Sequence, residues 1–121
     1  MLLYEDKIAR VVEIVDQVCL TTSNSIETKS IDPNSVFVNI DTIRKNINML
    51  YKEYLRPQHY ENVDSIKKDL ILIDGWCIES MEIMEYYMKT KQYNPKIAEN
   101  LANIRRYTNR MYDVFLKPQM Y

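Results

Sequence analysis

A chain of 121 residues has the length of one ordinary domain, and it can bury a core without disulfides or a metal ion. Its 16 basic and 17 acidic residues nearly cancel, which argues against a protein that coats nucleic acid through its overall charge. The single glycine argues against sheets, because hairpins and many other turns use glycine. We therefore predict one helical domain over residues 1–121.

Two cysteines, Cys19 and Cys77, fall on the apolar faces of predicted helices, where a reduced thiol acts as a small hydrophobic group. Their spacing gives no support for a disulfide. The first ten residues carry acidic side chains where a signal peptide needs basic ones, and no apolar run has the length of a membrane span. We predict a cytoplasmic protein. The many Ile, Asn, Lys and Tyr residues are typical of an AT-rich genome, such as that of a phage or plasmid.

The first predicted helix runs from Leu2 to about Leu20, because apolar residues recur there at every third or fourth position. The next stretch, Thr21 to Ile31, is rich in serine, threonine and asparagine. These side chains compete for backbone hydrogen bonds and disfavour helix interiors, so we predict a loop.

Asp32 and Pro33 mark the start of the second predicted helix. An aspartate side chain accepts hydrogen bonds from the free amides of a first turn, and proline suits the first helical position. Apolar residues spaced by three and four continue to about Leu55, and Pro57 discourages further extension. A start at Asp41, with residues 35–40 extended, is the alternative.

Residues 62–92 form the third and longest predicted helix. One apolar row lies along one side, and a second row widens it. We expect neighbouring helices to cover both rows, because so wide an apolar arc needs several neighbours. The first row comprises Val63, Ile66, Leu70, Ile73, Cys77, Met84 and Tyr87, with Ser80 as a polar interruption; the second comprises Ile71, Trp76, Ile78, Met81 and Ile83.

Asn94 and Pro95 repeat the Asp-Pro pattern and open the fourth predicted helix, which Pro118 ends. The connectors at residues 56–61 and 89–93 are short, which makes consecutive helices antiparallel neighbours. We therefore predict an all-α fold, an antiparallel (up-down-up-down) four-helix bundle with a long third helix. Its predicted core includes Val15, Ile47, Leu50, Ile73, Cys77, Leu101 and Ile104.

The charge pattern favours the same topology. The first and third predicted helices carry an acidic excess, and the second and fourth carry a basic one. In an up-down-up-down bundle each acidic helix lies beside two basic helices. Each exposed pair contributes little to stability, but the pattern helps to select this arrangement.

Residues of the kind that carry catalysis are scarce. His59 is the only histidine, neither cysteine belongs to a CxxC pair, and one glycine is too few for a phosphate-binding loop. Glu79, Glu82 and Glu85 recur at every third position, and we interpret them as a solvated acidic face rather than a cation site. We predict no enzymatic activity, no metal site and no cofactor.

Arginine and tyrosine gather on the fourth predicted helix, and both are enriched at the centres of protein interfaces. In the third helix Gly75 precedes Trp76, and a glycine inside a helix costs about 1 kcal/mol relative to alanine. Either the glycine makes room for a core tryptophan, or the pair marks a contact with a partner. The predicted partner-binding residues are Trp76, Arg105, Arg106, Tyr107, Arg110 and Tyr112.

These observations predict a non-enzymatic interaction protein, such as an adaptor, an inhibitor, an immunity-type protein or an assembly subunit. Its expected partner is another protein or a second copy of itself, and no membrane contact is expected. The alternative is a nucleic-acid-binding bundle that uses the fourth helix, because arginine holds phosphates and tyrosine stacks on bases.

Overall fold

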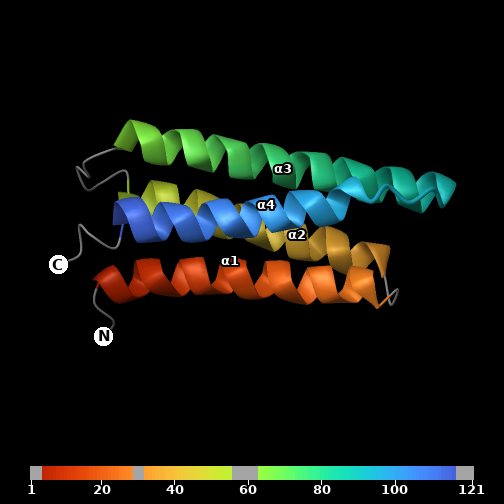
Figure 1. Cartoon of the computed structure of the whole chain (residues 1–121), viewed down its shortest axis with the longest axis horizontal. Coiled ribbons are helices and arrows are strands. Elements are labelled where there is room, and N and C mark those ends of the chain that lie inside the picture. Colours follow the sequence, from red (N-terminus) through yellow and green to blue (C-terminus); the bar gives the residue numbers. More distant parts are fainter. Residues whose placement is uncertain (1–3, 29–31, 56–62, 117–121) are drawn as a thin grey trace.

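The computed structural model describes residues 4–28, 32–55 and 63–116, and within these ranges it contains four α-helices and no strand (Figure 1). They are α1 (Tyr4–Glu27), α2 (Pro33–Met49), α3 (Val63–Thr90) and α4 (Lys96–Met111). Two short π-helical segments, η1 (Leu50–Leu55) and η2 (Tyr112–Leu116), continue α2 and α4. The predicted all-α fold is confirmed, and α3, with 28 residues, is the longest of the described helices. The predicted connector 56–61, with His59, lies outside the described residues.

The helices lie side by side along the long axis of the molecule (Figure 1). Both α1 and α3 pack against α2 and α4, which is the neighbour relation of the predicted up-down-up-down bundle. The predicted pairing of acidic with basic helices is also observed, because the ion pairs between described helices each join α1 or α3 to α2 or α4. These pairs are Arg44–Asp74 (2.7 Å), Lys96–Glu79 (2.9 Å), Arg105–Asp16 (2.6 Å) and Arg110–Asp69 (3.5 Å).

The predicted loop at Thr21–Ile31 is wrong over most of its length, because α1 continues to Glu27. Within this stretch the hydroxyl of Thr22 donates to the carbonyl of Val18 at 2.7 Å, and Ser25 donates to the carbonyl of Thr21 at 3.1 Å. The hydroxyls therefore bond within the helix instead of competing with it. Ile26 is buried with 8% of its surface exposed, so burial of this last turn favours the helix as well.

Both predicted helix starts are confirmed to within a residue. The Asp32 carboxylate accepts from the amide of Asn34 at 3.1 Å, and Pro33 occupies the first position of α2. The start of α2 at Pro33 excludes the alternative start at Asp41. The Asn94 side chain accepts from the amide of Lys96, which opens α4.

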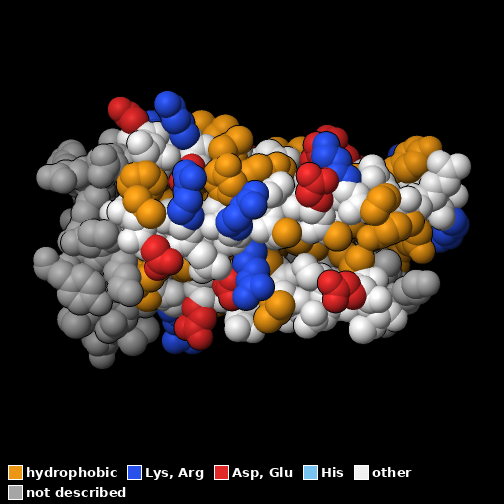
Figure 2. Space-filling view, viewed as in Figure 1, with side chains coloured by type: hydrophobic (Ala, Val, Ile, Leu, Met, Phe, Trp, Pro, Cys, Tyr) orange, Lys and Arg blue, Asp and Glu red, His pale blue; other side chains and the backbone are white. Residues whose placement is uncertain are grey.

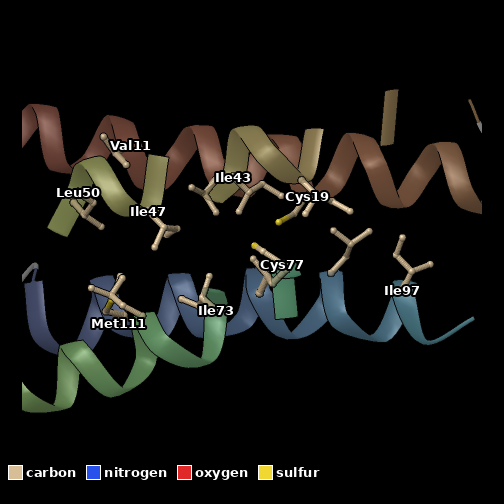
Figure 3. Packing of buried hydrophobic residues seen from close by; sticks show 14 of the residues in the cluster. Val11, Cys19, Ile43, Ile47, Leu50, Ile73, Cys77, Ile97 and Met111 are labelled. Carbon is tan, nitrogen blue, oxygen red and sulfur yellow. The ribbon is translucent and has the colours of Figure 1, made fainter. Parts of the chain in front are cut away.

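The core is continuous through all four described helices. Figure 3 shows side chains of α1 and α2 meeting those of α3 and α4, with Cys19 and Cys77 facing each other. Ser80 interrupts the apolar row of α3 because its hydroxyl accepts from the buried amide of Asn100 on α4 at 3.2 Å. Each residue of the predicted core is buried: Val15, Ile47, Leu50, Ile73, Cys77, Leu101 and Ile104.

Candidate functional site

The aromatic residues predicted to bind a partner pack against each other within the chain. The Trp76 ring on α3 meets the Tyr107 ring on α4 edge to face, with 4.9 Å between the ring centroids. The Arg110 guanidinium carbon lies 5.0 Å from the Tyr107 centroid, and that of Arg106 lies 5.8 Å away. Trp76, Tyr107 and Tyr112 are partly buried against the core. Contacts between α3 and α4 within the chain therefore already cover part of the surface of these aromatic rings.

The arginines of the same cluster are engaged as well. Arg105 pairs with Asp16 on α1, and Arg110 reaches Asp69 on α3 at 3.5 Å. Arg106 donates to Asn103, one turn earlier on α4, at 2.6 Å. Positive side chains on the face shown in Figure 2 therefore lie among negative ones instead of forming an unbroken basic surface.

Asp16 illustrates how strong one of these contacts is. Burial raises its pKa, but hydrogen bonds from Arg105 at 2.6 Å and Asn109 at 2.8 Å outweigh burial and lower the pKa below its ordinary value. The same ion pair raises the pKa of Arg105. Arg105 thus joins α4 to α1. That the arginine and tyrosine residues of α4 (the helix-four cluster: Arg105, Arg106, Tyr107, Arg110 and Tyr112) bind a partner or nucleic acid stays a prediction.

A different surface emerges on the outer side of α3. Ile71 has 71% of its surface exposed, Leu72 has 44% and Ile78 has 37%, although Ile71 and Ile78 were predicted to be covered. The expectation fails because, among the described elements, α3 packs mainly against α2 and α4, and the side of α3 that carries Ile71 and Ile78 lies away from both. Hydrophobic side chains reach the surface along α3 among charged ones (Figure 2).

Gly75 lies in the middle of this exposed side. Apart from neighbours in its own helix, a Cβ atom placed on Gly75 would meet no atom of the described residues within 4 Å. No other described helix therefore approaches Gly75, while the neighbouring Trp76 is partly buried against the core. Packing within the described chain does not explain a residue that weakens the helix at this position.

A groove adjoins the same surface between α3 and the end of α2. Its volume is about 230 Å³. Charged and aromatic groups border it: Arg44 pairs with Asp74, and the Lys67 ammonium lies 5.8 Å from the centroid of the Tyr51 ring. The groove is lined by Ile47, Asn48, Tyr51, Lys67, Leu70, Ile71 and Asp74.

The tyrosines at the α3–α4 turn form a smaller cluster. The rings of Tyr87 and Tyr93 meet edge to face at 6.4 Å, and the Tyr86 hydroxyl donates to the Gln92 side chain at 3.1 Å. Tyr86 and Tyr93 are exposed to 53% and 41%. Their hydroxyls and ring edges fit an ordinary wet rim of a helical bundle.

The cysteine thiols and the Glu79 carboxylate have pKa values that keep them in their ordinary protonation states at neutral pH. Burial raises the pKa of both Cys19 and Cys77 to about 12, which keeps these thiols protonated at neutral pH. Hydrogen bonds from Lys96 and then Asn100 lower the pKa of Glu79. Among the residues that the structure describes, no group of three or more His, Cys, Asp or Glu side chains is arranged to hold a metal ion.

Comparison of the chain with protein-family models, with curated proteins and with solved structures gave no match. Within residues 4–28, 32–55 and 63–116, none of the helices combines the length and the apolarity that crossing a membrane requires.

Proposed function

We propose that the protein is a non-catalytic interaction protein that binds another protein chain through the outer face of α3. This face carries three large apolar side chains at its centre and charged side chains towards both ends. The observation that carries the proposal is the 71% exposure of Ile71 beside two further exposed apolar residues. The outer face of α3 comprises Lys67, Lys68, Ile71, Leu72, Gly75, Ile78 and Glu82.

Single exposed apolar residues are normal on a protein surface, but contiguous ones mark interaction sites. Ile71, Leu72 and Ile78 lie within about two helical turns of each other, and the groove extends the apolar surface from Ile71 towards α2. Full burial of such a side chain stabilises a complex by about 1.5–3 kcal/mol. A charged rim around an apolar centre is the usual composition of a protein interface.

Affinity capture from the native host tests this proposal. The bait is the tagged wild-type chain, and the variant carries Ile71→Gln and Ile78→Gln, which remove apolar surface without adding charge or breaking the helix. Val38→Gln is the matched control, because Val38 is 59% exposed on a different helix, α2. We expect one polypeptide, either a host protein or a second copy, to be retained by wild type and control but lost from the double variant.

A partner retained equally by all three baits contradicts the proposed surface. A further bait, Arg106→Ala, then tests the helix-four cluster while leaving its ion pairs to α1 and α3 in place. Far-ultraviolet circular dichroism of each bait shows that the helical bundle is intact. If no bait retains a polypeptide and the wild type does not self-associate, the proposed function is wrong.

A further inference from the structure

We infer that the outer face of α3 binds the same face of a second copy of this chain, with the two α3 helices antiparallel and crossing at Gly75. This inference rests on the proposed function, because it names the partner of that surface. The residues that carry it are arranged almost symmetrically about the glycine along α3.

The charges on this face match in an antiparallel pair. Lys68 lies seven residues before Gly75 and Glu82 lies seven residues after it, and both side chains are exposed. A twofold axis at Gly75 therefore places Lys68 of each copy opposite Glu82 of the other. A parallel pair in register places each lysine against a lysine instead, which is unfavourable. Lys67, also exposed, lies next to Lys68 and adds positive charge to the same end of the face.

The apolar residues match in the same way. Leu72 lies three residues before Gly75 and Ile78 lies three residues after it. The twofold axis therefore places Leu72 of each copy level with Ile78 of the other along the helix, with Ile71 one residue from Leu72. The interface then has an apolar centre and charged ends about 21 Å apart along the helix, from the rise of 1.5 Å per residue.

Gly75 supplies the close approach that such a crossing needs. Two helices whose backbones come near each other need a small residue at the contact point, and glycine is the smallest. Among the described residues, apart from neighbours in its own helix, nothing lies within 4 Å of the place where its Cβ would be, so the open space above Gly75 is available to the other helix. Dimerisation through this face thus accounts for a glycine that the monomer does not use.

Sedimentation equilibrium over a range of concentrations tests the inference. The wild type is expected to approach twice the monomer mass, with Lys67→Glu plus Lys68→Glu and, separately, Glu82→Lys each raising the dimer Kd at least tenfold. Mixing these two variants restores association, because the reversed charges of one copy then face those of the other. This exchange of charges is a readout that loss of folding does not produce.

Substitution of Gly75 tests independently whether the dimer needs close approach of the two α3 helices at this residue. Gly75→Leu is expected to raise the dimer Kd at least tenfold, whereas Ala102→Leu, at an exposed position of α4, leaves it unchanged. Three results overturn the inference: a wild type that stays monomeric near millimolar concentration, a dimer insensitive to Gly75→Leu, or charge variants that do not recover on mixing. A monomeric wild type that still captures a host protein through Ile71 and Ile78 leaves the proposed function standing.

Discussion

At the scale of single residues, Asp16 shows how one polar contact between helices makes stability depend on pH. The carboxylate is 21% exposed and accepts hydrogen bonds from Arg105 and Asn109, both on α4. These bonds lower its pKa in the folded protein, whereas an unfolded chain keeps the ordinary value of 3.8. The unfolded state therefore takes up a proton first as the pH falls, and this favours unfolding.

We predict that Asp16→Asn lowers the free energy of unfolding by about 1 kcal/mol at pH 7, because a charge-assisted hydrogen bond is lost. The contribution of Asp16 is fully present above its unfolded pKa of 3.8 and is lost as the pH falls through its lower folded pKa. Urea unfolding curves at several pH values between neutral and acid then converge for wild type and variant. A constant difference at all pH values contradicts this assignment.

Residue patterns predicted the local features of the chain that depend on near neighbours. The cap of α2 by Asp32 follows from a side-chain oxygen placed before a proline, and Asn94, one residue before the N-cap Pro95, likewise accepts from the first amide of α4. The buried state of Ile73 and Cys77 follows from helical spacing alone. The exposure of Ile71 and Ile78 does not follow from helical spacing. Spacing shows which residues share a face of a helix, but not whether another helix covers that face.

At the scale of the elements, the end of α1 was predicted less well than the helix centres. Thr22, Ser25 and Thr28 disfavour helices when their hydroxyls bond to local backbone outside a helix, but here they donate to carbonyls one turn earlier. Burial of Ile26 adds a tertiary contribution that the local sequence does not reveal. The end of α3 is different, because Lys91 adopts a left-handed conformation with φ 61° and its amide donates to the carbonyl of Tyr87.

We predict that Lys91→Gly raises the free energy of unfolding by about 0.5–1 kcal/mol, because glycine adopts positive φ without the steric cost that a Cβ imposes. Lys89→Gly is the matched control, since Lys89 lies two residues earlier in the last turn of α3. That substitution is expected to lower the free energy of unfolding by about 1 kcal/mol. Thermal and urea unfolding of the two variants measure the difference, and equal effects contradict the assigned helix end.

At the scale of the whole molecule, the topology was predictable because two patterns agree. Apolar rows specify which side of each helix faces the core, and alternating charge places acidic helices beside basic ones. The candidate site was not predictable in the same way. Each helix of an up-down-up-down bundle packs mainly against two neighbours, so two members of the second apolar row on α3, Ile71 and Ile78, remain outside the core, whereas Ile83 is buried in it.

The continuous core also predicts how the thiols react. Cys19 on α1 and Cys77 on α3 are fully buried at the centre of the molecule, and burial raises the pKa of each to about 12. Modification of either thiol therefore requires separation of helices that share one core, and not the opening of a loop.

We expect both thiols to react with a thiol reagent at the same slow rate in native buffer, and both rates to rise with urea as global unfolding does. Rapid labelling of one cysteine without urea contradicts a shared core, because that thiol must then become accessible while the rest of the bundle stays folded. The variants Cys19→Ala and Cys77→Ala identify which thiol reacts in each measurement.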